Sequence, residues 1–214
     1  MLSADRIVEL HDGLTRAWHA VGQPESIEMD EAAMENTGVD SAWLRSLTLH
    51  HRANFDLWHI EDEARTPGAT DAELADVKRR VDQTNQQRND FVEQLDHSLL
   101  GWLGPLKLPN PVAPLNSESP GLMIDRLSIL GLKIFHTCEE AEREGAPLGH
   151  ALRNRERFEI LKEQRDDLAG CLNVLWKETL AGTRQFKLYR QLKMYNDPTL
   201  NPAIYRKNLQ YPDS

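Results

Sequence analysis

The sequence contains two cysteines among its 214 residues, too few for a disulfide framework or a thiolate metal site. Cys138 and Cys171 both lie in segments with helical periodicity and do not form a C-x-x-C pair. We therefore expect two small buried thiols in a reducing compartment, and a cytoplasmic location.

Positive charge is also scarce in this chain. Lys and Arg total 25 against 34 Asp and Glu, which gives a formal net charge of −9 at neutral pH. Binding to nucleic acid or to an anionic membrane surface needs a surplus of Lys and Arg on one face. The balance argues against both partners, but it leaves room for a local basic pocket.

Long apolar runs and established catalytic motifs are missing as well. No stretch approaches the roughly 20 apolar residues of a membrane span, and the start, with Asp5 and Glu9, does not have the pattern of a secretory signal. There is no Walker loop, no G-x-G-x-x-G turn, no H-E-x-x-H and no di-iron arrangement of E-x-x-H pairs. The sequence therefore names neither a reaction nor a cofactor.

What the sequence does contain is helical periodicity along most of its length. The residues from Thr70 to Glu73 have the spacing of a capping box, and Ser119-Pro120 places an N-cap before a first-turn proline. The predicted helices cover about residues 3–21, 41–65, 70–99, 120–143, 150–180 and 183–198. This pattern predicts an all-α fold, an irregular helical bundle of about five long helices plus a C-terminal helix.

The chain is expected to form a single helical domain over residues 1–214. Residues 41–200 form its core, and residues 1–40 hold the first helix and an acidic connector that begins at residue 22. Residues 104–120 contain five prolines, which exclude helix and central strand, so a loop is predicted there.

The predicted helix over 41–65 has polar side chains where its apolar face should be. A helical wheel places five polar or amphipathic residues at the centre of that face, and puts His59 on the solvent side with Arg52. The five are His51, Asn54, Trp58, Glu61 and Arg65. Because burying an unpaired charge costs several kcal/mol, these side chains require partners or a water-filled cleft.

Charged residues interrupt the apolar faces of other predicted helices too. Five cations on inward positions outnumber the acids Glu61, Asp62 and Asp125, and an excess of buried cation favours an anionic ligand. The five are Arg88, Arg126, Lys133, Arg157 and Arg165. Structural ion pairs, such as Arg88 with Glu61, remain the alternative for each cation taken singly. His11, His50 and His97 are interpreted as helix-flank residues.

Two chemistries fit this set of residues. In the first, the cations clamp a phosphate or carboxylate while His51 or His136 transfers a proton, with Glu61 or Asp125 fixing the imidazole tautomer. In the second and weaker one, His51, His136 and Glu61 or Asp62 ligate a divalent metal ion. We therefore assign no metal ligands, and we take as candidate catalytic residues His51, Glu61, Asp125 and His136.

The candidate ligand-binding residues include the turn before the helix at 120–143, where free amides favour negative charge. We expect this turn and the proline-rich loop to border one cleft, formed by the helices at 41–65, 70–99, 120–143 and 150–180. His51, Glu61, Arg88, Asp125 and His136 are expected to approach it together. The full candidate set is Asn54, Trp58, Arg65, Arg88, Asn116, Ser117, Glu118, Arg126, Lys133, Arg157 and Arg165.

Four blocks of the sequence, HHRANFDLWHIEDEAR, VDQTNQQRND, NSESPGLMIDRLSILGLKI and FKLYRQLKMYNDPTLNPAIY, resemble a bacterial all-helical family of unknown function. The blocks cover most of the chain beyond residue 40. The resemblance implies an all-helical bacterial protein associated with cell-surface polysaccharide and glycosyltransferase genes, and it supplies no reaction. The candidates that match its blocks are His51, Asn54, Trp58, Glu61, Asp62, Arg65, Asn116, Ser117, Glu118, Asp125, Arg126 and Lys133.

Together these features predict binding of, or catalysis on, an anionic small molecule such as a phosphorylated or nucleotide-linked sugar in bacterial surface-polysaccharide metabolism. One alternative is a non-catalytic helical adaptor for a glycan-assembly enzyme, whose buried charges fix the helix register. A metal-dependent helical-bundle hydrolase is a further alternative. Whether the chain is an enzyme, and whether it assembles with further copies of itself, is left open.

Overall fold

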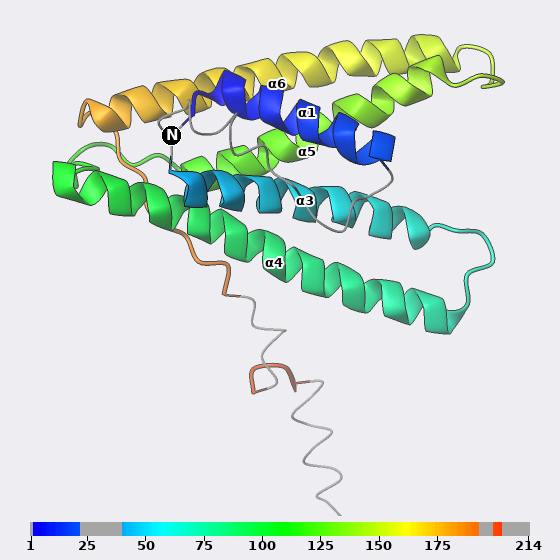
Figure 1. Ribbon diagram of the computed structural model, residues 1–214, viewed down its shortest axis with the longest axis horizontal. Coiled ribbons are helices and arrows are strands. Elements are labelled where there is room, and N and C mark those ends of the chain that lie inside the picture. Colours follow the sequence, from blue (N-terminus) through cyan, green and yellow to red (C-terminus); the bar gives the residue numbers. More distant parts are fainter. Residues whose placement is uncertain (1, 22–39, 193–198, 203–214) are drawn as a thin grey trace, which may run out of the picture.

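The computed structural model describes residues 2–21, 40–192 and 199–202 (Figure 1). Within them the chain is all-α and contains no named strand, which confirms the predicted fold class. The helices are α1 (Ala4–Val21), α3 (Ser41–Glu63), α4 (Asp71–Leu103), the short 3-10 helix η1 (Gly104–Leu106), α5 (Pro120–Glu142) and α6 (His150–Leu180). The acidic connector over 22–39 lies outside the described residues.

The helices form two long antiparallel hairpins with α1 laid against them. α3 pairs with α4 and α5 pairs with α6, while α1 packs on α5, α6 and α3 (Figure 1). The core between these elements is aliphatic. Its fully buried members include Ile7 of α1, Leu47 of α3, Leu95 of α4, Leu127 of α5 and Leu172 of α6.

Two helices begin at the positions predicted from their capping residues. The Thr70 hydroxyl accepts from the Glu73 amide and the Glu73 carboxylate accepts from the Thr70 amide, so the capping box at the start of α4 is formed. Ser119 caps α5, with Pro120 in the first turn.

The start of α5 also lies in close contact with α4. A Cβ placed on Gly121 would lie 2.6 Å from the Val92 carbonyl oxygen and 2.9 Å from Cγ of Asp96. The Gly121 amide donates to the Asp96 carboxylate over 2.6 Å. The chain can cross this closely because residue 121 has no side chain.

The predicted C-terminal helix is wrong over residues 183–192, where the chain is not helical. Gly182, at φ 71°, ends α6 in a left-handed conformation, and the chain then runs beside the proline-rich loop. The Gln185 amide donates to the Pro114 carbonyl and the Gln185 carbonyl accepts from Asn116, while Phe186 is buried in the core. Bonds to the loop thus replace the intrahelical ones. Residues 193–198 lie outside the described part.

Two other expectations are tested by the fold. Cys138 and Cys171 are free but exposed, so the prediction of buried thiols is wrong: both lie on the outer faces of α5 and α6. In the described residues, none of the helices is long and apolar enough to cross a membrane.

Candidate functional site

The C-terminal half of α3, the middle of α4 and the middle of α5 enclose a solvent-open cleft of about 390 Å³, called here the ligand cleft. Five of the predicted ligand-binding or catalytic residues line it: Asn54, Trp58, Glu61, Arg65 and Arg88. The remaining lining residues are Leu57, Asp62, Asn85, Ile129 and Leu132. No residue of α6 and none of the proline-rich loop is among them, so the predicted four-helix border with its loop is wrong.

The polar face of α3 divides into a buried half and an exposed half. His51 and Asn54 are 0% and 4% exposed, whereas the side chain of Glu61 is 48% exposed and that of Arg65 is 67% exposed. Glu61 and Arg65 were expected on the inward face of this helix, with partners or a water-filled cleft. They are exposed because the three helices surround an open cleft at that level.

Asp125 anchors the inner wall of the cleft. Its carboxylate accepts from Nε and Nη2 of Arg88, over 2.7 and 2.5 Å, and from Nδ2 of Asn54 over 3.1 Å. Nε2 of His50 lies 2.8 Å from the same carboxylate. Three helices therefore converge on a single acidic group.

Electrostatics keep this group ionised. Burial by itself raises the pKa of Asp125, but the hydrogen bonds from His50 and Arg88 outweigh burial and hold the pKa well below its usual range. The same pairing raises the pKa of Arg88. A carboxylate locked in this way fixes Arg88 in place, and it is a poor candidate for proton transfer near neutral pH.

His51 lies behind the cleft rather than on it. Its two ring nitrogens face hydroxyl groups, with Nε2 2.9 Å from Thr15 Oγ1 and Nδ1 2.8 Å from Ser128 Oγ. Its ring stacks on His11 at 4.3 Å. Burial, with a smaller contribution from the charge of His50, lowers the pKa of His51 to about 3. Because the ring is sealed and neutral, the proposed acid–base role has no access to a cleft ligand.

His136 borders the cleft only indirectly. Its ring stacks on Trp58, which does line the cleft, with centroids 4.6 Å apart and an interplanar angle of 7°. Its ring nitrogens point elsewhere, because Nδ1 lies 2.8 Å from the Glu139 carboxylate. Of the five groups expected to share one space, Arg88 and Glu61 line the cleft. Asp125 lies directly behind Arg88, and His51 and His136 also lie one layer behind the lining residues.

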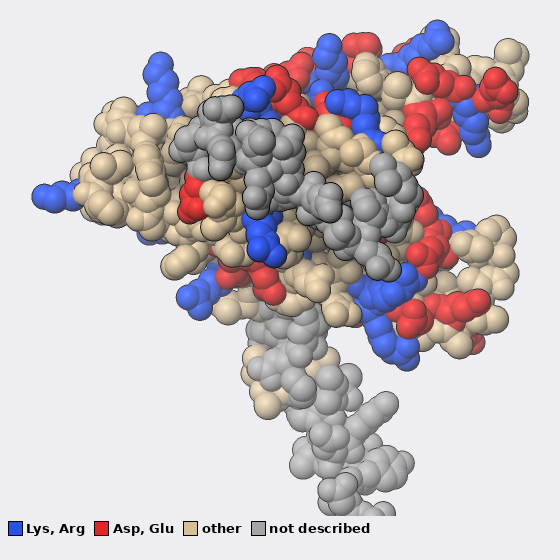
Figure 2. All heavy atoms as spheres, in the orientation of Figure 1, with Lys and Arg blue, Asp and Glu red and all other residues tan. Residues whose placement is uncertain are grey.

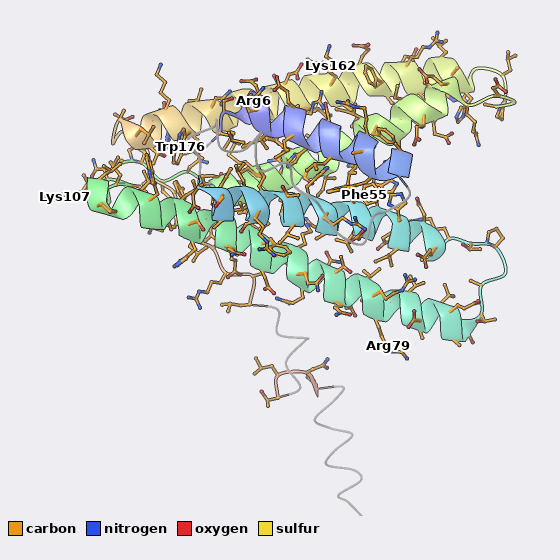
Figure 3. The ribbon with its side chains drawn as sticks, viewed as in Figure 1. Arg6, Phe55, Arg79, Lys107, Lys162 and Trp176 are labelled. Carbon is orange, nitrogen blue, oxygen red and sulfur yellow. The ribbon has the colours of Figure 1, made fainter. Side chains whose placement is uncertain are left out.

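His136 belongs to a second constellation, called here the histidine cluster: His19, His59 and His136. One ring nitrogen from each of the three lies within 4.8 Å of the other two. The rings come from α1, α3 and α5, and they sit among the aromatic rings of Phe55 and Phe135. Phe55, labelled in Figure 3, lies on the side of α3 that faces α1. His59 was expected to face solvent, and it is half-buried because α1 and α5 close over that side of α3.

The remaining candidate cations lie away from the ligand cleft. Arg165 is bound by the Asp12 carboxylate at 2.9 and 3.0 Å, and Arg157 donates to Asn154 on its own helix. Arg126 pairs with Glu118, and Lys133 is exposed. The inferred excess of buried cation is therefore wrong, chiefly because Asp12 and Asp125 neutralise the two inward arginines. In Figure 2, acidic and basic side chains are interspersed over the described surface of that view, without one large area of either sign.

The turn before α5 also lies apart from the ligand cleft, contrary to expectation. Asn116 Nδ2 donates to the Glu118 carbonyl, and Ser117 between them is exposed. Glu118 lines a separate depression of about 630 Å³ between α5 and α6, together with Arg126 and Lys133. The turn lies here because it leads directly into the close crossing of α5 and α4 at Gly121.

Comparison with protein families gives one finding. A family described as "Protein of unknown function (DUF4254)" matches residues 44–188, about two thirds of the chain. The chain belongs to this family. Comparison with curated proteins and with solved structures gives no match.

The DUF4254 region contains every residue that lines the ligand cleft. It also contains His59 and His136, but α1 precedes it, and α1 supplies His19 to the cluster, Thr15 to His51 and Asp12 to Arg165. Sequence reasoning missed these α1 residues and Asn85. The spacing of His11, Thr15 and His19, four residues apart on one face of a predicted helix, was the available signal.

Proposed function

We propose that this protein binds a phosphorylated or nucleotide-linked sugar in the ligand cleft. The observation that carries the proposal is the composition of that cleft, which combines an aromatic wall, side-chain amides, carboxylates and two guanidinium groups. Small-molecule sites typically combine an apolar wall with a few polar groups that fix the ligand's orientation.

Each component has a counterpart in such a ligand. Trp58 offers an aromatic face for the apolar side of a sugar ring, held in place by its stacking on His136. Asn54, Asn85 and Glu61 offer acceptors and donors for hydroxyl groups. Arg65 offers the planar N–H groups that suit a phosphate, and Arg88 offers Nη1, the nitrogen that does not donate to Asp125.

The two arginines differ in how they would act. Arg88 is immobilised by Asp125, so little conformational entropy is lost when it meets a ligand. Arg65 is exposed and tied to Glu61 and Asp62 within its own turn. Exposed pairs of this kind contribute about 0–1 kcal/mol, so a phosphate can draw Arg65 away from them at low cost.

The wider role proposed with this ligand is a cytoplasmic one in bacterial surface-polysaccharide metabolism. It is supported by the resemblance of the four sequence blocks described above and by the chemistry of the cleft. The proposed function is binding without a catalytic step, since the two histidines assigned to proton transfer do not line the cleft.

The test is a binding measurement with matched arginine variants. Titration calorimetry with UDP-glucose, glucose 1-phosphate, glucose and inorganic phosphate is expected to show binding of at least one phosphorylated sugar and much weaker binding of glucose or phosphate alone. Arg65→Ala should weaken binding about tenfold or more, because a charge-assisted contact is lost. Arg126→Ala removes an equally exposed, Glu-paired arginine outside the cleft, and it should leave the affinity unchanged. Loss of binding in Arg126→Ala alone would place the ligand elsewhere.

The adaptor alternative is favoured by a different observation. The start of α6 and the turn before it expose large apolar side chains: Leu148 is fully exposed, Leu152 is 62% exposed and Ile160 is 54% exposed. Apolar side chains gathered at one end of a helix are a feature of protein-binding surfaces. If none of the sugars binds and Leu152→Asp abolishes association with a glycan-assembly enzyme, the adaptor function replaces the proposed one.

A further inference from the structure

The histidine cluster brings together three imidazoles from three separate helices. The ring centroids of His19 and His59 are 5.3 Å apart, those of His19 and His136 are 5.0 Å apart, and those of His59 and His136 are 5.8 Å apart. None of the three pairs is stacked; the interplanar angles lie between 48° and 73°. The rings thus meet in tilted or edge-to-face contacts, and one nitrogen of each lies within 4.8 Å of the other two.

In each ring the nitrogen Nδ1 is already occupied. Nδ1 of His19 donates to the Thr15 carbonyl and Nδ1 of His59 donates to the Phe55 carbonyl, both over 2.8 Å. Nδ1 of His136 lies 2.8 Å from the Glu139 carboxylate. A hydrogen bond from Nδ1–H fixes the neutral tautomer in which Nε2 carries a lone pair. Metal-ligating histidines usually have such a partner behind them.

The described part of the protein supplies no hydrogen-bond partner for the Nε2 atoms of two of these rings. Those of His19 and His136 are buried and have no hydrogen-bond partner among the described residues. An unpartnered buried polar atom costs about 1–3 kcal/mol, and two in one small space indicate that something else satisfies them.

We propose that His19, His59 and His136 bind a divalent transition-metal ion of the zinc class through Nε2. Imidazole nitrogen is the ligand type that suits Zn²⁺, Ni²⁺ and Cu²⁺, whereas Mg²⁺ and Ca²⁺ prefer oxygen. Three protein ligands leave one position of a tetrahedral ion for water or another small ligand. With Zn–N bonds of about 2.0–2.1 Å, the nitrogens around a tetrahedral ion lie about 3.3 Å apart, so the three rings must move closer together when the ion binds.

The surroundings of the cluster are consistent with a metal ion. The three rings come from three different helices, and a hydrogen bond at Nδ1 holds each of them in place. Phe55 and Phe135 shield the centre from bulk water. The ion would tie α1 to α3 and α5, and through His136 it would also hold Trp58, the aromatic wall of the ligand cleft.

The experiment is a metal titration of the full chain after treatment with a chelator. Calorimetry with Zn²⁺, and absorption spectroscopy with Co²⁺ as a coloured probe, should show one tightly bound ion per chain, and Zn²⁺ should raise the melting temperature. His59→Gln and His136→Gln should each weaken binding by about a hundredfold or more. Glu139→Gln, which alters only the group behind His136, should weaken it by about ten- to hundredfold.

The matched control is His97→Gln, which removes an exposed histidine of α4 and should leave metal affinity unchanged. Circular dichroism of each variant without metal separates loss of ligation from loss of fold. The proposal is overturned if the wild-type chain binds no ion stoichiometrically. It is equally overturned if folded His59→Gln and His136→Gln bind as tightly as the wild type, because the ion would then lie elsewhere.

Discussion

Lowering the pH from about 7 to about 5 should destabilise the folded chain through His11 and His51. Both rings are completely buried, and burial is the largest cause that lowers their pKa values, in His51 from 6.5 to about 3 and in His11 well below 6.5. In the unfolded chain both return to the ordinary value. As the pH falls below 6.5, the unfolded chain therefore takes up protons that the folded one does not, and the folded state loses stability.

The size of the effect follows from the unfolded chain. At about pH 5 the solution is about 1.5 pH units below the ordinary histidine pKa, and each unit corresponds to about 1.4 kcal/mol, so His51 costs about 2 kcal/mol. The lowered pKa of His11 adds to this loss. Asp96 acts in the opposite direction, because burial raises its pKa to about 6, and it returns about 1 kcal/mol over the same interval. The expected net loss is therefore at least about 1 kcal/mol.

Asp125 does not contribute in this interval. Its pKa is lowered in the fold, so the stability that it provides is present above the ordinary carboxyl pKa of 3.8 and is lost only as the pH falls below that value. The lowered pKa of His136 acts in the same direction as those of His11 and His51.

The assay is urea unfolding at both pH values, with a chelator present so that the histidine cluster is free of metal. His11→Leu is the diagnostic variant, because neither ring nitrogen of His11 has a hydrogen-bond partner among the described residues. Its stability at about pH 7 should be unchanged or raised by about 1 kcal/mol, and its loss on acidification should be smaller than that of the wild type. His97→Gln should behave as the wild type. Equal stability of the wild type at both pH values, or an undiminished loss in His11→Leu, would refute the reasoning.

Three further substitutions, two of them with a matched control variant, test the packing and the ion pairs by urea unfolding. Gly121→Ala should cost about 3 kcal/mol because its Cβ meets a backbone carbonyl of α4, whereas Gly101→Ala, with open space around it, should stabilise α4 by up to about 1 kcal/mol. Arg165→Met should cost about 2 kcal/mol by leaving its partner carboxylate on α1 half-buried and unpaired, whereas Lys133→Met should change stability by less than about 0.5 kcal/mol. Asp125→Asn should cost about 3–5 kcal/mol, since it leaves the guanidinium of Arg88 without its carboxylate. A smaller loss than that of Arg165→Met would contradict the role of Asp125 as the group on which three helices converge.

Local signals in the sequence predicted the helices well. Capping residues such as Thr70 and Ser119 act within one turn, so their effect can be read without knowing the fold. The segment after Gly182 shows the limit of this reasoning. Its residues suit a helix, but the bonds of Gln185 to the proline-rich loop and the burial of Phe186 depend on a partner more than sixty residues away.

The candidate site was predicted less completely, for a related reason. The helical wheel placed Asn54, Trp58 and Arg88 on the right faces, and the cleft lies there. A wheel does not show how far along a helix its neighbours extend, so it could not tell that His51 is sealed in the core while Glu61 faces the open cleft. It also cannot pair charges between helices, and the match of Asp12 with Arg165 joins residues 153 positions apart.

The position of α1 has a practical consequence for anyone who works with fragments of this protein. A fragment cut to the family match at residues 44–188 would keep both hairpins but remove the helix that seals one face of them. His51 would lose the Thr15 hydroxyl, Arg165 would lose its carboxylate, and Leu47 and Leu127 would lose the cover of Ile7. Such a fragment would expose an apolar groove that contains two polar groups without their partners, and it should aggregate. Adding α1 back as a separate peptide should restore solubility.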